Sequence, residues 1–196
     1  MKFSAVILAG GQSRRMGRDK AWLEVGGQTL LARQIQLVRE AGAAEVFISG
    51  RADTDYSVFG CAMLFDRFPD AGPLAGIERA LAAASSLQVL VLAVDLPNMT
   101  ASLLRGLAAR CVNNSGVIPR MEGRLEPLAA FYPKSAGSLA ANLLGEGLNA
   151  ATSFAERCVE NNFATFVDLP VRAARCFANW NAPADAVCNL PPVVKP

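Results

Sequence analysis

Residues 3–20 read FSAVILAGGQSRRMGRDK, and this stretch decides the fold. Its first seven residues, Phe3 to Ala9, form an apolar run with β-branched members, which is typical of a buried central strand. The run ends at the double glycine Gly10-Gly11, and the polar, basic segment from Gln12 to Lys20 predicts a loop. The chain therefore opens with a buried strand that leads directly into a glycine-rich loop.

Strand and helix signals alternate along the rest of the chain. Segment 29–41 carries Leu31, Ile35 and Val38 on one helical stripe, and Gly42 follows as a C-cap. Further strands are expected at 45–49, 62–65, 89–94, 117–118, 128–132 and 163–167, and further helices at 74–84, 101–110 (capped by Thr100), 135–144 and 152–159. This alternation predicts an α/β fold of three layers: a mostly parallel central sheet with helices on both faces.

The chain of 196 residues is of a length that suits one domain. Apolar residues make up 52% and charged residues only 18%, so the chain can bury a sizeable core and disorder is not expected. We expect one domain over residues 1–189. The proline-rich segment 190–196 (LPPVVKP) is expected to form a loosely ordered tail.

Charge and cysteine content argue against several classes of protein. A net charge of +2 gives no reason to expect binding to nucleic acid or to a membrane surface, and no apolar run is long enough for a membrane helix. The five cysteines form no C-x-x-C pair and are odd in number, which indicates neither a disulfide framework nor a zinc site. We expect reduced thiols in a cytoplasmic protein.

The chain contains no histidine. This absence removes every Ser-His-Asp or Cys-His catalytic group and every histidine-ligated metal. It also removes the commonest general base near neutral pH. Catalysis, if there is any, must therefore use carboxylates, cationic side chains, backbone amides or a hard metal ion.

The loop after the first strand has the composition of an anion-binding loop. Gly10, Gly11 and Gly17 allow the backbone to approach a ligand closely, and successive amides in such a loop can surround an anion. The cations that a polyphosphate requires are Arg14, Arg15, Arg18 and Lys20. The spacing matches neither G-x-x-x-x-G-K-[ST] nor G-x-G-x-x-G. The alternative is a glycine-rich turn with solvated charges.

A carboxylate follows the most strand-like segment, VLVLAV at 89–94. Asp95 is expected at the end of a buried strand, where a carboxylate is costly unless it is paired or binds a metal. Mg²⁺ typically takes one or two carboxylates together with substrate phosphates, so Asp95 is a candidate metal ligand. The alternative is that Asp95 only caps the turn that follows.

Three further segments carry candidate site residues, each with a plain structural alternative. Segment 65–77 places Asp66 near a helix start at Pro73, or is simply a strand-to-helix connection. Arg124 and Glu126 belong to a hairpin, expected between strands 117–118 and 128–132, that either binds an anionic acceptor or carries solvated charges. Asn179 and Asn181 would point to one face of an extended strand, or are turn residues before a proline.

The motif LAGGQSRRMGRDK at 8–20 resembles the signature L-A-G-G-x-S-x-R-M-G-x-D-K of the MobA-like nucleotidyltransferases. GPLAGI, the strand end D-x-P, R-x-E-P-L and F-x-N-x-N-x-P-x-D follow in the family's order, so the resemblance runs from about residue 8 to residue 185. It implies a Rossmann-like α/β fold. It also implies transfer of GMP from GTP to molybdopterin, the organic part of the molybdenum cofactor, with release of pyrophosphate.

The resemblance also assigns roles, residue by residue. It implies that the nucleotide is bound by Leu8, Ala9, Gly10, Gly11, Lys20, Ser49, Asp66 and Asp95. Arg15, Lys20 and Asp95 are implied as catalytic, with Asp95 holding Mg²⁺ or Mn²⁺. Arg124, Glu126, Asn179 and Asn181 are implied to bind the acceptor. GTP and the molybdenum cofactor are the implied partners, together with other cofactor-biosynthesis proteins or molybdoenzyme chaperones.

Two other readings of the same motifs stay open. Related cytidylyltransferases more often read L-A-A-G where this chain has Leu8 to Gly11, so a CTP-dependent enzyme that acts on this cofactor or another phosphorylated small molecule is the first alternative. A nucleotide-binding module without turnover is the second. The late motif departs from the family pattern, because Trp180 stands where a smaller apolar residue is common.

Overall fold

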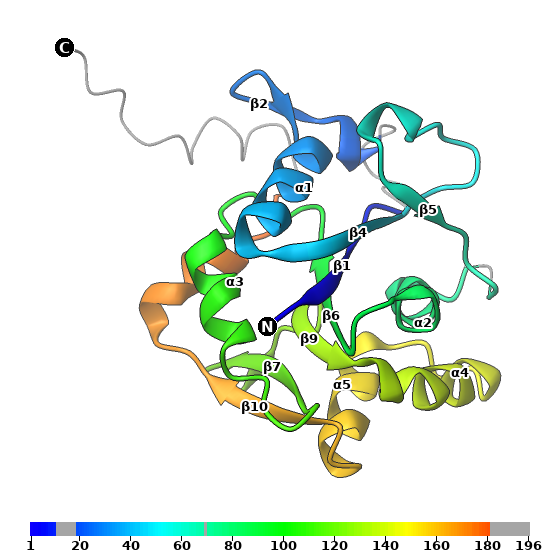
Figure 1. Ribbon diagram of the computed structural model, residues 1–196, viewed down its shortest axis with the longest axis vertical. Coiled ribbons are helices and arrows are strands. Elements are labelled where there is room, and N and C mark those ends of the chain that lie inside the picture. Colours follow the sequence, from blue (N-terminus) through cyan, green and yellow to red (C-terminus); the bar gives the residue numbers. More distant parts are fainter. Residues whose placement is uncertain (11–18, 69, 181–196) are drawn as a thin grey trace.

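The computed structural model describes residues 1–10, 19–68 and 70–180, and its centre is a twisted sheet covered on both faces by helices (Figure 1). The sheet order is β10-β7-β9-β6-β1-β4-β5, and β8 pairs antiparallel with the C-terminal end of β7. These strands are β1 (Phe3–Leu8), β4 (Ala43–Ser49), β5 (Ala62–Leu64), β6 (Gln88–Ala93), β7 (Gly116–Met121), β8 (Arg124–Leu125), β9 (Ala129–Pro133) and β10 (Ala164–Asp168).

The sheet is mostly parallel, as the alternation of strands and helices predicted. β1 pairs in parallel with β4 on one side and with β6 on the other, and β5 and β10 are also parallel to their neighbours. β9 is the exception, because it runs antiparallel between β6 and β7. The fold class expected from the sequence is therefore confirmed.

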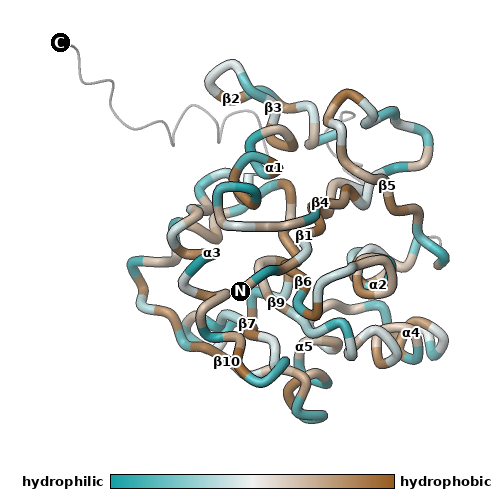
Figure 2. Tube along the Cα trace, viewed as in Figure 1, coloured by the Kyte–Doolittle hydropathy of each residue, from teal (hydrophilic) through white to brown (hydrophobic). Residues whose placement is uncertain are grey.

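Two apolar clusters separate the sheet from its helices. α1 (Leu30–Ala41) and α3 (Ala101–Ala108) cover one face, and α2 (Pro73–Ala83), α4 (Gly137–Gly145) and α5 (Ala151–Glu160) cover the other (Figure 1). Apolar segments run through the central strands, whereas polar segments lie in the peripheral loops and alternate with apolar ones along the helices (Figure 2). Both faces of the sheet are buried beneath helices, which agrees with the uninterrupted apolar runs of β1 and β6.

Local signals in the sequence set the ends of the helices. Thr29 and Thr100 accept hydrogen bonds from Ala32 N and Leu103 N at 3.2 Å and so cap α1 and α3. Gly42 ends α1 in the left-handed conformation, with φ of 104°. The caps at Thr100 and Gly42 were predicted from the residue types alone, whereas Thr29 was expected inside the helix.

The hairpin after β7 differs in detail from the expected one. β7 continues to Met121, reverses over Glu122 and Gly123, and returns as β8, so that β9 is a separate strand. Glu122 and Gly123 both have positive φ, of 47° and 81°, as a two-residue hairpin turn with right-handed twist requires. A short hairpin of β2 (Glu24–Val25) and β3 (Gln28–Thr29) and the 3₁₀ helices η2 (Ser57–Phe59) and η4 (Val171–Phe177) were not expected. The helix expected from residue 135 begins as the 3₁₀ helix η3 (Lys134–Ala136) and continues as α4.

Cys61, Cys111, Cys158 and Cys176 are free thiols, and Cys188 lies outside the described residues. In the part of the chain that the structure describes, no helix combines the length and the apolar character needed to cross a bilayer.

Close packing between β7 and β9 predicts the effect of a small substitution. A Cβ at Gly116 would overlap the Phe131 carbonyl oxygen, whereas a Cβ at Gly106, inside α3, meets nothing within 4 Å. Gly116→Ala should lower the free energy of unfolding by about 1–3 kcal/mol, and Gly106→Ala should raise it by about 0.5–1 kcal/mol. Urea unfolding of both variants tests this pair, and equal midpoints would contradict the packing described.

Candidate functional site

Three neighbouring parallel strands end level with one another at one edge of the sheet. Leu8 of β1 pairs with Ser49 of β4 and with Ala93 of β6. Hydrogen bonds continue past these ends, from Ala9 N to Ser49 O (2.7 Å) and from Gly10 N to Ser49 O (3.1 Å). The structure thus brings four of the predicted nucleotide-binding residues together where ligands of parallel sheets usually bind.

An ion pair joins the segment after β1 to the end of β6. Lys20 Nζ lies 2.8 Å from Asp95 Oδ2, and the two side chains are only 19% and 21% exposed. Lys20 begins the 3₁₀ helix η1 (Lys20–Trp22), whose N-cap Asp19 accepts a hydrogen bond from Ala21 N at 2.9 Å. Residues 75 positions apart in the sequence therefore present a cation and a carboxylate at one place.

Tyr56 links the loops that follow β1 and β4, and the sequence analysis missed it. The Tyr56 hydroxyl donates a hydrogen bond to the Asp19 carboxylate, next to Lys20. Its ring packs against Gly50, where a Cβ would lie 2.5 Å from a ring carbon, and Trp22 stacks on it with ring centroids 6.1 Å apart. Burial and the Asp19 contact raise the pKa of Tyr56 to about 12, so it stays a neutral donor.

Helix α2 packs tightly against the ends of β1 and β4. A Cβ at Gly76 would overlap the Ser49 hydroxyl and would lie 2.9 Å from Leu8 Cδ2. Ser49 itself is only 5% exposed. Gly76, the second glycine of the segment GPLAGI, therefore allows α2 to approach the strand ends closely.

Asp66 lies just beyond β5, beside Ser49. Surrounding protein atoms displace water from its carboxylate and raise its pKa, and the charge of Glu78 adds to this. Arg79 and a hydrogen bond from Ser49 oppose the shift. Glu78, in contact with Arg67 at 3.8 Å, is 5% exposed. Asp66 therefore belongs to a group of charges at the same sheet edge as Leu8.

The turn between β7 and β8 also reaches this edge, because β7 runs parallel to β6 through the intervening β9. Arg124 Nη2 pairs with Glu126 Oε1 at 2.6 Å. The Arg124 side chain is 71% exposed, as the solvated-hairpin alternative expects, but that of Glu126 is 16% exposed. Burial raises the pKa of Glu126 and Arg124 opposes that shift, so the pair is only half solvated.

The late asparagine motif is next to Asp95. Trp180 N donates a hydrogen bond to Asp95 O at 3.0 Å, and the Trp180 side chain is 4% exposed, whereas Asn179 is exposed. The residues before Asn179 form the 3₁₀ helix η4 rather than a strand. Asn181, which was expected to share one face with Asn179, lies outside the described residues.

Several other residues of the predicted anion-binding loop lie outside the described part of the chain, and Gly11 and Arg15 are among them. They are Gly11, Arg14, Arg15, Gly17 and Arg18. Among the residues that are described, no group of three or more histidine, cysteine, aspartate or glutamate side chains could hold a metal by itself. A metal at Asp95 would need further oxygen ligands from a substrate.

Comparison with known proteins places these features in a family. Residues 5–164 match the family described as "MobA-like NTP transferase domain". The chain is 41% identical over 185 residues to a protein of Opitutus terrae named "Probable molybdenum cofactor guanylyltransferase", covering 93% of this chain and 92% of the relative. A protein of Carboxydothermus hydrogenoformans with the same name is 33% identical over 184 residues, with the same coverage.

Solved structures of more distant proteins share the fold. Molybdopterin-guanine dinucleotide biosynthesis protein A from Archaeoglobus fulgidus superposes with a TM-score of 0.75 at 22% identity, covering 96% of both chains. The 2-C-methyl-D-erythritol 4-phosphate cytidylyltransferase from Thermus thermophilus gives a TM-score of 0.69 at 24% identity, covering 96% of this chain and 97% of that one. At these identities the likeness concerns the fold alone.

The environment of Asp66 predicts an unusual titration. Its raised pKa means that Asp66 takes up a proton at a higher pH than an ordinary aspartate, and Ser49→Ala should raise the pKa further because a hydrogen bond to the carboxylate is lost. NMR of ¹³C-labelled carboxyl groups during a pH titration measures both values. Ser85→Ala is the control, since Ser85 donates to Glu45 instead. An Asp66 pKa at or below the usual range would contradict the geometry.

Proposed function

The chain belongs to the family of MobA-like NTP transferases, and we propose that it transfers GMP from GTP to molybdopterin and releases pyrophosphate. The family match covers most of the chain and supports nucleotidyl transfer. The names of the relatives from Opitutus and Carboxydothermus support guanine as the base and molybdenum cofactor as the acceptor. The double glycine Gly10-Gly11 is a further, smaller argument for GTP.

The observation that carries this proposal is the Lys20–Asp95 ion pair at the ends of β1 and β6. A nucleotidyl transfer brings two phosphate groups together, so it needs a cation for the phosphates and a carboxylate for a metal at one place. Lys20 pairs with Asp95, and phosphate oxygens are the partners that it would take in exchange when a nucleotide binds. A plain turn cap at Asp95 needs no such partner.

The nucleotide would lie along the ends of β1 and β4. Leu8, Ala9 and Gly10 offer backbone groups at this place, and Gly10 allows close approach because it has no side chain. Ser49 and Asp66 supply a hydroxyl and a carboxylate on the α2 side of these strands. Arg15 and Gly11 are proposed to contact the polyphosphate, on the strength of the motif alone.

A divalent cation fits the donor set at the end of β6. One carboxylate, Asp95, is 21% exposed at a strand end, and Mg²⁺ characteristically combines one or two carboxylates with substrate phosphates and water. Such an ion, Mg²⁺ or Mn²⁺, would supply charge neutralisation between the two reacting phosphates. Asp95 would hold it, and Lys20 and Arg15 would stabilise the charge that moves to pyrophosphate.

The reaction is an in-line displacement. A terminal phosphate oxygen of molybdopterin attacks the α-phosphorus of GTP, one P–O bond forms, and the bond to the β-phosphate breaks as pyrophosphate leaves. The attacking phosphate is already ionised, so no general base is needed, in agreement with the absence of histidine. Positioning and charge stabilisation are then sufficient for catalysis.

The nucleotide would lie on the β4 side of Asp95, and the acceptor would approach Asp95 from the opposite side, where β7 and β8 lie. The half-buried pair of Arg124 and Glu126 lies on the turn that reaches the same sheet edge, and Asn179 precedes Trp180, which is hydrogen-bonded to Asp95 O. We propose that Arg124 attracts the phosphate of the acceptor, with Glu126 orienting the guanidinium. Asn179 and Asn181 are proposed as further contacts of the acceptor or the metal.

Nucleotide selectivity tests the proposal directly. With molybdopterin and Mg²⁺, we expect pyrophosphate release and a dinucleotide product from GTP, with kcat/KM for GTP exceeding that for CTP by about 10²-fold or more. Coupled pyrophosphate detection and mass spectrometry of the product measure both. A preference for CTP would establish the cytidylyltransferase alternative. Binding of GTP without pyrophosphate release, given a competent acceptor, would instead indicate a module without turnover.

Removing the metal ligand should separate folding from catalysis. Asp95→Ala should lower turnover by about 10²-fold or more while leaving the circular dichroism spectrum and the melting temperature close to those of the wild type. The control is Asp168→Ala, which breaks an exposed ion pair with Arg120 between β10 and β7 and should leave turnover unchanged. A folded Asp95→Ala protein with wild-type turnover would end the metal assignment.

A further inference from the structure

The backbone turn that carries Asp95 is held by two distant parts of the chain. Trp180 N donates to Asp95 O at 3.0 Å, and Gln34 Nε2 donates to Leu96 O at 2.7 Å. Met99 N also donates to Leu96 O, at 3.1 Å, and this bond closes the turn itself. The Leu96 carbonyl therefore has a partner without Gln34, and what the Gln34 bond adds is a link between the turn and helix α1.

The amide of Gln34 is costly at the place where it lies. Gln34 is 1% exposed, and its Oε1 is buried without a hydrogen-bond partner among the described residues. Such an acceptor loses its hydration on folding and gains no hydrogen bond in return, so it lowers the stability of the folded chain. A methionine of similar size would avoid this cost. The hydrogen bond that the amide does make leads to the turn that carries Asp95.

The same part of α1 is also tied to the segment of Lys20. Leu30 N, at the first residue of α1, donates to Leu23 O at 2.8 Å, and Leu23 N donates to Lys20 O at 3.1 Å. Leu30 is fully buried, and Gln34 follows it after about one helical turn. The first turns of one helix are therefore connected to both partners of the ion pair between Lys20 and Asp95.

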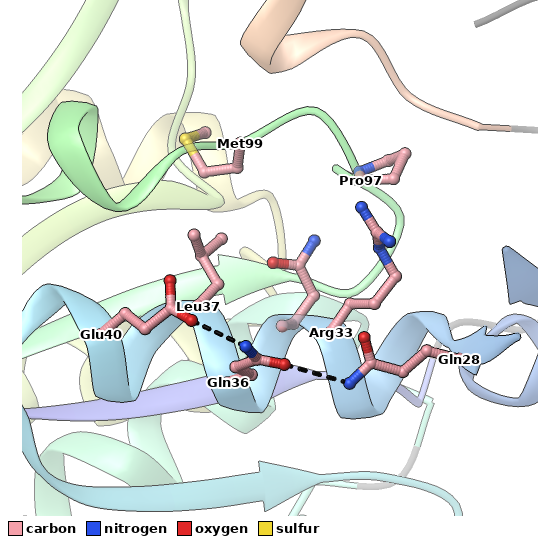
Figure 3. Close-up of a pocket in the computed structure, with 8 residues that line it drawn as sticks. Gln28, Arg33, Gln36, Leu37, Glu40, Pro97 and Met99 are labelled. Atoms are coloured by element: carbon pink, nitrogen blue, oxygen red, sulfur yellow. Dashed lines mark hydrogen bonds between the residues drawn. The ribbon is translucent and has the colours of Figure 1, made fainter. Parts of the chain in front are cut away.

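A pocket lies between α1 and the segment that follows β6. Its walls include Arg33 and Leu37 on the helix and Pro97 and Met99 on the segment, which lie opposite one another in Figure 3. Side chains that leave a gap between them fix a distance poorly, whereas a hydrogen bond fixes it to roughly a few tenths of an ångström. The hydrogen bond of Gln34 therefore sets the separation of helix and turn more sharply than the packing around it.

We propose that Gln34 is a positioning residue that holds the Asp95 carboxylate beside Lys20, where it can take a divalent cation; this inference rests on the proposed function. Gln34 touches neither the metal nor the nucleotide in this assignment. It acts through the backbone of Leu96, the residue that follows Asp95. Replacement of a residue that orients a metal ligand in this way commonly changes metal affinity or activity by about 10- to 100-fold.

Gln34→Met tests this role, because it removes the amide and keeps a side chain of similar size. The variant loses an unsatisfied acceptor together with one hydrogen bond, so its melting temperature should stay close to that of the wild type. Hydrogen exchange at the amides of Met99 and Trp180 should become faster by about three- to tenfold. Binding of Mn²⁺ to the GTP complex, followed by electron paramagnetic resonance, should weaken by about tenfold or more, and kcat should fall with an unchanged KM for GTP.

Gln88→Met is the matched control. Gln88 is 3% exposed, and both polar atoms of its amide are buried without a hydrogen-bond partner among the described residues. It begins β6, whereas Asp95 follows the other end of that strand. The same substitution at this position should leave Mn²⁺ binding, kcat and the hydrogen exchange of Met99 and Trp180 unchanged.

Each outcome decides the assignment. Weaker Mn²⁺ binding in Gln34→Met alone, in a protein that melts like the wild type, supports it. Unchanged Mn²⁺ binding overturns it even where hydrogen exchange is faster, because Gln34 would then only brace the fold. Equal losses in Gln34→Met and Gln88→Met, or losses in proportion to the unfolded fraction, overturn it too. A wild-type protein that transfers nothing from GTP, combined with weakened Mn²⁺ binding in Gln34→Met, would contradict the proposed function but not the positioning role.

Discussion

The structure depends on the burial of β1 between two parallel partners. Ala5, Val6 and Ile7 are fully buried, so both faces of the strand are dry and every backbone group must be paired within the sheet. β4 and β6 supply those pairs in register from Ser4 to Leu8. The chain can therefore leave the sheet only where β1 ends, and it leaves β4 and β6 at the same level of the sheet. The polar loops are therefore gathered at one edge.

The loops at this edge also hold one another in place. The Tyr56 hydroxyl, from the loop after β4, bonds to Asp19, the residue before Lys20, and the tyrosine ring fits against Gly50 because that residue lacks a side chain. Gly76 likewise allows α2 to pack closely against Ser49, because it lacks a side chain. The Tyr56 contact holds Asp19, the residue before Lys20, in place, and a cation that is already in position would need little reorganisation when charge moves during a reaction.

Much of this arrangement follows from local chemistry and could be predicted from sequence. The apolar run of β1 needs two dry faces, Thr29 and Thr100 are good caps, and Gly42 accepts a left-handed conformation. The meeting of Lys20 with Asp95 follows from two loops that must share one sheet edge. Their proposed work in binding phosphate and metal remains a prediction.

Other features depend on contacts between distant residues and left no local signal. The insertion of antiparallel β9 between β6 and β7 is a choice among strand orders that all bury the same apolar residues. Tyr56 stands in a segment without a recognisable motif, and Gln34 reads as an ordinary position on the buried side of α1. The observed hairpin turn differs in position from the expected one for a related reason. Glu122 has a positive φ there, which its residue type does not suggest.

The two tryptophans of the chain give the site an optical reporter of its own. Trp22 is 40% exposed and stacks on Tyr56 at one side of the Lys20–Asp95 pair, whereas Trp180 is 4% exposed and is hydrogen-bonded through its backbone to Asp95 O at the other. A solvent-exposed indole and a buried indole emit fluorescence at different wavelengths. Substitution of either one by phenylalanine would let intrinsic fluorescence follow events on each side of the pair separately, without a label.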